Sequence, residues 1–228
     1  MKKIITALLL AGILLSAASC GRNRDKNLES TSSSTQETTN SGGENFETNA
    51  AKSFLHSVYG AFLGQAAPIY DADSAEDVKE FFAGPEMETV TEKDPESGKE
   101  ESYEVPKNEP GAISLSDGEN LESQTLFPAA SVDKLESAAV FFNIRNQNHG
   151  TFAAFEVKNE SDVQALADMM KNKIKDNQWL CGFPDRYQIM RVGDIIVFSY
   201  GLENLMSAWK SAVSSVYEDV AVLYDEMI

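Results

Sequence analysis

The sequence predicts an α+β fold: an antiparallel sheet of about four strands, in the order hairpin, helix, hairpin, helix, with helices packed on one face. Three observations predict it. Two pairs of strand-like segments flank short polar turns at residues 146–150 and 193–194, as in β-hairpins. A capping box of Ser161 and Gln164 opens a helix between the hairpins. Apolar residues then recur at a period of 3.6 from Leu202 onward, which is typical of an amphipathic helix.

The elements of the last ninety residues follow from these patterns. The four strands are expected over residues 140–145, 151–157, 187–192 and 195–200. The helix between the hairpins is expected to end near Trp179, and the final helix to continue unbroken to Met227. Residues 195–198 are apolar on both faces of their strand, which favours a central position in the sheet.

The first half of the folded region carries weaker patterns. Thr48 or Asn49 can cap the first helix, and Ser74 can cap the second. The acidic run at residues 71–76 lacks the glycine and the distal glutamate of an EF-hand loop, so we interpret it as a helix start. The elements expected in this half are helices over residues 49–65, 74–83 and 131–138 and a hairpin over residues 86–105.

The first twenty residues have the organisation of an export signal. Two lysines precede an apolar run of residues 4–15, and small residues at 17–19 lead to Cys20. The run is too short for a transmembrane helix, which needs about 20 apolar residues. The stretch resembles the lipobox signal peptide of bacterial lipoproteins, which implies removal of residues 1–19 and lipidation of Cys20, with palmitate among the acyl chains. An ordinary secretory signal peptide is the alternative.

Composition divides the remaining chain into a tether and a domain. Residues 20–48 are rich in Ser, Thr, Asn and Gly, and such a segment cannot bury enough apolar surface to order itself. Residues 49–228 are expected to form a single α+β domain with an acidic insert at residues 86–122. The net charge of −17 excludes nucleic acid as a partner, because phosphate binding depends on Lys and Arg.

Several features of residues 52–215 occur together in a fixed order. They are Tyr59-Gly60, the segment 152–157, three lysines at 171, 173 and 175, the strand 187–192 and the segment 193–198. In this order they resemble an uncharacterised lipoprotein family of Gram-positive, largely anaerobic gut bacteria, described as a domain of unknown function. The acidic insert is longer than in that family. The resemblance implies an extracellular domain held at the cell membrane, and it supplies no catalytic residue.

Candidate catalytic and metal-binding residues are few. Cys181 can pair only with His149 or His56, and no His follows Cys181, unlike in cell-wall cysteine peptidases. Two His and one free Cys do not make a zinc site, which needs three or four ligands. No phosphate-binding loop, Gly-x-Ser-x-Gly or His-Glu-x-x-His motif occurs. We therefore predict no catalytic residue, no metal site and no cofactor.

Four aromatic residues can line a groove for a sugar or a peptide: Trp179, Tyr187, Tyr200 and Trp209. Core packing is the main interpretation for most of them. The sequence predicts a non-enzymatic binding or scaffolding module of the cell envelope. Its expected partners are membrane lipid, through Cys20, and an envelope protein or cell-wall ligand. The alternative is a cell-wall enzyme or a small-ligand receptor whose site the sequence patterns do not reveal.

Overall fold

The computed structural model describes residues 49–228, apart from residues 96 and 181. The export signal, Cys20 and the tether lie outside the described residues, so what the sequence says of them stays a prediction. The described residues belong to one compact unit. Among them, no helix is both long enough and apolar enough to cross a membrane.

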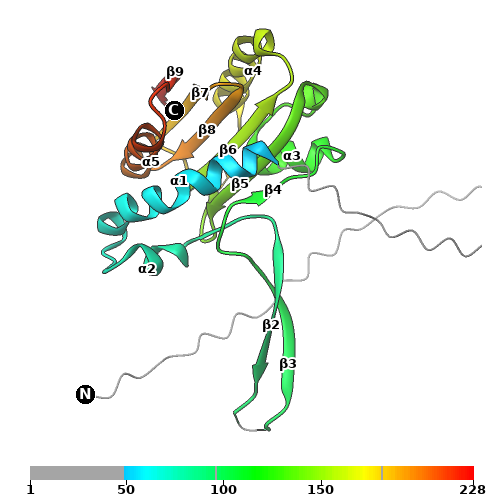
Figure 1. The fold of residues 1–228 in the computed structure, drawn as a ribbon, viewed down its shortest axis with the longest axis vertical. Helices are drawn as coiled ribbons and strands as arrows, with labels where there is room; N and C mark the ends of the chain where they lie inside the picture. The colour runs from blue at the N-terminus through cyan, green and yellow to red at the C-terminus, as the bar shows by residue number, and fades with distance from the viewer. Residues whose placement is uncertain (1–48, 96, 181) are drawn as a thin grey trace, which may run out of the picture. The chain divides into compact units, whose positions relative to one another are not determined.

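An antiparallel sheet of seven strands forms the centre of this unit (Figure 1). Its strands are β1 (Phe82–Ala83), β4 (Gly111–Ala112), β5 (Leu135–Asn143), β6 (Gly150–Val157), β7 (Arg186–Val192), β8 (Ile195–Gly201) and β9 (Ala221–Met227). Six of them follow the order β1-β5-β6-β8-β7-β9, and β4 also pairs with β5. The α+β class and the antiparallel sheet are therefore confirmed, and the sheet is wider than predicted.

Helices cover both faces of the sheet, so the expectation of helices on one face is wrong. The α-helices are α1 (Ala50–Ala66), α2 (Ala75–Lys79), α3 (Gly118–Thr125), α4 (Val163–Asp176) and α5 (Glu203–Val216). Helices α1 and α5 lie side by side on one face (Figure 1) and pack on Phe141 and Phe152. Helices α3 and α4 pack on the opposite face, on Val140 and Phe155. Two apolar faces require two covering layers, because exposed apolar area on either face is unfavourable.

The central strands explain this three-layer arrangement. All seven residues of β8 are buried, and eight of the nine residues of β5 are buried or half-buried. The prediction that residues 195–198 lie in a central strand is confirmed, since β8 sits between β6 and β7. Helix α1 begins as predicted, because the side chain of Asn49 accepts the N–H of Lys52 at 2.7 Å.

The predicted long final helix is wrong beyond residue 216. Helix α5 ends at Val216, and residues 221–227 form β9, which pairs with β7 at the edge of the sheet. The strand places Asp225 and Glu226 toward opposite faces. Asp225 pairs with Arg186 and Lys210, both at 2.7 Å, and Glu226 pairs with lysines of α4. A continued helix would leave the outer backbone groups of β7 without partners.

The ion pairs of β9 favour charged carboxylates. Lys171 and Lys175 bond to Glu226 at 2.6 and 2.7 Å, and the hydroxyl of Tyr187 donates to it at 2.8 Å. These donors lower the pKa of Glu226 to about 2. The C-terminal strand is therefore joined to α4 through its charged side chain as well as to β7 through its backbone.

Two shorter predicted helices also end differently. The second helix stops at Lys79, and Phe82 and Ala83 form β1 against the end of β5. The helix expected over residues 131–138 is a 3₁₀ turn, η2 (Ala129–Lys134), and the chain then enters β5 at Leu135. In both places a backbone partner in the sheet outweighs a local helical preference, since propensity is a weak prior. The other 3₁₀ turns are η1 (Ala67–Tyr70), η3 (Gln147–His149) and η4 (Glu160–Asp162).

The hairpin predicted over residues 86–105 is confirmed as β2 (Met87–Lys93) and β3 (Glu100–Pro106). It extends beyond the central sheet as a two-stranded ribbon (Figure 1). Most of its side chains are exposed. An isolated hairpin of this kind is marginally stable, and the 2.8 Å hydrogen bond between Thr91 and Ser102 is one of its cross-strand links.

Candidate functional site

Two adjoining depressions lie beside Trp179, where the turn after β5, the end of α4 and the end of β8 meet. Their volumes are about 600 Å³ and about 510 Å³, within the usual range for small-molecule sites. We call this pair of depressions the amide groove. The two depressions share four lining residues: Gln147, Asn148, Asn177 and Trp179. The larger depression adds residues of α3, and the smaller one adds residues 144–146, Gln178 and Leu180.

Asparagine side chains build the turn that carries half of this groove. Asn143, at the end of β5, accepts the N–H groups of Arg145 at 3.0 Å and Asn146 at 3.2 Å through its side-chain oxygen. Asn146 then accepts the N–H of Asn148 at 3.0 Å and opens η3. Asn is favoured in such turns because its short side chain replaces a backbone acceptor. The turn is thereby held in one conformation with Gln147 and Asn148 at the groove.

The other half of the groove follows α4. The chain leaves the helix at Asn177 in an extended conformation, and Trp179 then lies half-buried with its ring centroid 5.3 Å from that of Tyr200. The side-chain amide of Asn148 donates to the carbonyl of Gly182 at 2.8 Å. This bond ties the segment after Trp179 to η3. Leu180 is 90 % exposed beside the indole, an unusual position for a large apolar side chain.

The larger depression is lined by two glutamates of α3, the exposed Glu119 and the ion-paired Glu122. The carboxylate of Glu122 accepts the N–H of Ala129 at 2.8 Å and pairs with Lys173. The Ala129 N–H and then Lys173 lower the pKa of Glu122. Tyr200 is 4 % exposed, and burial raises the pKa of its hydroxyl. The depression therefore presents a neutral phenol, the Glu122–Lys173 ion pair, amide groups and the exposed side chain of Glu119.

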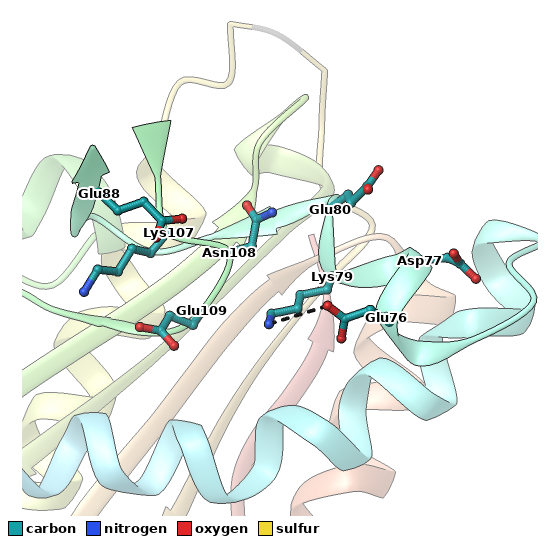
Figure 2. A pocket seen from close by; sticks show the side chains of 8 residues that line it. All are labelled: Glu76, Asp77, Lys79, Glu80, Glu88, Lys107, Asn108 and Glu109. Carbon is teal, nitrogen blue, oxygen red and sulfur yellow. Dashed lines mark ion pairs between the residues drawn. The ribbon is translucent and has the colours of Figure 1, made fainter. Parts of the chain in front are cut away.

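A third cavity, of about 500 Å³, lies between α2 and the base of the hairpin (Figure 2). Its lining holds five carboxylates and two lysines: Glu76, Asp77, Glu80, Glu88 and Glu109, with Lys79 and Lys107. Figure 2 shows that the carboxyl groups of Asp77, Glu80 and Glu109 point in different directions. No group of three or more His, Cys, Asp or Glu in the described part of the chain could hold a metal ion. This cavity is an acidic surface hollow without converging ligands.

The aromatic residues named from the sequence divide into two classes. Trp179 and Tyr200 line the amide groove, whereas Tyr187 and Trp209 are fully buried in the core. Core packing is thus confirmed for Tyr187 and Trp209, and also for Tyr200, which is 4 % exposed and packs in the core beside the groove. His149 ends η3, and His56 is exposed on α1. Cys181 lies outside the described residues, so its pairing with either histidine is untested.

The sequence patterns do not single out the amides of the groove. Residues 146–148 are Asn-Gln-Asn and residues 177–178 are Asn-Gln, directly before Trp179. The first run predicts only a turn, and the second only the end of a helix. Two amide-rich segments, one of them next to a tryptophan, are the signal that could have found this site.

Comparisons with protein-family models, curated proteins and solved structures find no match for this chain. The resemblance to an uncharacterised lipoprotein family therefore stays a prediction. The site is assigned on the geometry of its own residues.

Proposed function

We propose that this protein is a lipid-anchored binding module of the cell envelope that holds a saccharide in the amide groove. The observation that carries the proposal is the half-buried indole of Trp179 between two depressions that share three amide side chains. A pyranose ring has an apolar C–H face and a rim of hydroxyl groups. An indole offers a flat apolar surface for the face, and Asn and Gln offer both donors and acceptors for the rim.

Binding fits the groove better than hydrolysis. A glycosidase needs a carboxylic acid with a raised pKa, so that it can protonate the leaving oxygen, and a second carboxylate across the scissile bond. Glu122 is poorly suited to the acid role, because the Ala129 N–H and Lys173 lower its pKa. The other glutamate of the groove, Glu119, is exposed and lacks the apolar surroundings that a catalytic acid needs. The amides and the aromatic ring can orient a sugar without activating it. This supports a binding module over a cell-wall enzyme.

The proposal includes the anchor predicted from the sequence. Cys20 would carry the lipid, and residues 21–48 would separate the domain from the membrane by an r.m.s. distance of roughly 30 Å. Two acyl chains give stable anchoring because each buried methylene contributes about 0.8 kcal/mol. Cys20→Ala is expected to move the protein from the membrane fraction to the medium or to leave it unprocessed. An unchanged membrane fraction of mature size would overturn the anchor.

Saccharide binding is tested by calorimetry on the full chain in detergent, with soluble β-1,4-linked oligomers of N-acetylglucosamine as probes. Trp179→Ala is expected to weaken binding at least tenfold, because it removes the stacking surface; a tenfold change corresponds to about 1.4 kcal/mol. Tyr103→Ala is the matched control, since Tyr103 is an exposed aromatic residue on the hairpin and does not line the groove.

Three outcomes would contradict the proposal. Equal affinities for the wild type, Trp179→Ala and Tyr103→Ala would remove the groove as the binding site. Cleavage of the oligomers, detected by chromatography of the same samples, would favour the enzyme alternative. An affinity for a monosaccharide equal to that for the oligomers would favour a small-ligand receptor. In that case an oligomer would gain nothing from occupying both depressions.

A further inference from the structure

We infer that Arg145 gives the amide groove a subsite for a carboxylate, so that the saccharide it prefers is an acidic one. This inference rests on the proposed function and names the ligand class of the same groove. It comes from the position of Arg145, from the side chains that orient its guanidinium, and from the lack of a carboxylate partner within the described residues.

Arg145 lines the smaller depression together with the amides and Trp179. It is the only charged residue among the described residues that line this depression. The protein as a whole carries a net charge of −17, and the cavity in Figure 2 is lined by five carboxylates. A hollow whose single charge is positive is therefore a local exception on an acidic molecule, and it attracts anions.

The guanidinium is oriented before any ligand arrives. Its central carbon lies 4.5 Å from the centroid of Phe81. Phe81 in turn stacks on Tyr70, with ring centroids 4.5 Å apart and an angle of 21° between the ring planes. The hydroxyl of Tyr70 accepts a hydrogen bond from the side-chain amide of Asn143 at 2.7 Å. Stacking on an aromatic face leaves the edges of the guanidinium open for planar hydrogen bonding.

Arg145 also differs from the other arginines that the structure describes. Arg186 pairs with Asp225 at 2.7 Å and Glu203 at 3.3 Å, and Arg191 pairs with Glu160. Within the described residues Arg145 forms no ion pair, and Lys173 in the larger depression is already paired with Glu122. The donors of Arg145 are therefore available to a ligand. A guanidinium binds a carboxylate through two parallel hydrogen bonds, which adds both affinity and orientation.

The test compares two disaccharides that differ by one acidic substituent. The first joins N-acetylglucosamine to N-acetylmuramic acid, whose lactyl ether carries a carboxylate, and the second is N,N′-diacetylchitobiose, which lacks the lactyl group. The wild type is expected to bind the acidic disaccharide about tenfold more tightly, as one charged hydrogen-bonded pair provides. Arg145→Gln is expected to abolish this preference, so that the ratio of the two affinities falls to about one. Raising the salt concentration is expected to reduce the preference of the wild type.

Arg191→Gln is the matched control, because Arg191 forms a surface ion pair with Glu160 and does not line the groove. It is expected to keep the full preference. Equal binding of both disaccharides by the wild type, or a preference that survives Arg145→Gln, would overturn the carboxylate subsite and leave the proposed function standing. Failure of the wild type to bind either disaccharide would overturn both. Tighter binding of glucosamine 6-phosphate than of N-acetylmuramic acid would assign the subsite to phosphate instead.

Discussion

Replacing Trp209 with alanine is expected to lower the free energy of unfolding by about 3–5 kcal/mol, the range for a large aromatic residue removed from a core. Trp209 is 0 % exposed. Its ring lies 5.0 Å from Phe152, 5.6 Å from Phe62 and 5.7 Å from Phe141. It therefore joins α5 to α1 and to the two strands beneath them. Domains of this size are stable by about 5–15 kcal/mol, so this loss is a large fraction of the total.

Urea denaturation followed by circular dichroism measures this loss, and Trp179→Ala is the matched control. Both variants remove an indole, but Trp179 is only half-buried at the amide groove. We expect the control to change stability by about 1 kcal/mol or less and to affect saccharide binding instead. Similar losses of stability in the two variants would contradict the assignment of Trp209 to the core and of Trp179 to the groove.

Replacing Gly201 with alanine is expected to destabilise the fold by about 3 kcal/mol, at the upper end of the range for overpacking. A Cβ atom at this position would lie 2.4 Å from the carbonyl oxygen of His149 and 2.8 Å from the Cα of Gly150. These are backbone atoms that cannot move aside independently. The same carbonyl accepts the N–H of Leu202 at 3.0 Å, so relieving the clash breaks the contact between the end of β8 and the start of β6.

The substitution is also expected to weaken saccharide binding, because η3 carries Gln147 of the groove and ends at His149. Chemical denaturation measures the stability, and hydrogen exchange at the Leu202 amide measures the local opening. Gly64→Ala is the control: Gly64 lies inside α1, and a Cβ atom added there would have no neighbour within 4 Å. Alanine at this position is expected to stabilise the helix by about 0.5–1 kcal/mol. A neutral effect of Gly201→Ala would show that β6 and β8 tolerate a wider separation.

The elements that the sequence predicted well depend on neighbours in the chain. Asn49 caps α1 through Lys52, three residues away, and Ser74 caps α2 through Asp77. The turn at residues 193–194 joins β7 to β8 as expected. These two caps and this turn involve atoms only two to four residues apart, which is why the sequence pattern predicts them. The capping box expected at Ser161 and Gln164 is wrong: the chain enters α4 through η4, and Asp162 is the N-cap residue without a side-chain hydrogen bond.

The errors occur where distant partners compete with local preference. The apolar stripe that follows Leu202 is compatible with a helix to its end, but β7 needs an outer backbone partner, and Lys210 and Arg186 need Asp225. These requirements are met only if residues 221–227 form a strand. The expectation of helices on one face is wrong for a related reason. Whether a second helical layer covers the other face of the sheet depends on how distant parts of the chain pack.

The fold class and the order of the central hairpins can be derived from the sequence, because each depends on composition or on short spacing. The export signal over residues 1–19 stays a prediction of the same kind. The amide groove cannot be derived in this way. It requires Asn148 and Trp179, 31 positions apart, to meet, and it requires Arg145 to lie on Phe81, from a separate part of the chain. Such contacts form when the sheet and its two helical layers are assembled, and that assembly is what makes a ligand site out of a turn and the end of a helix.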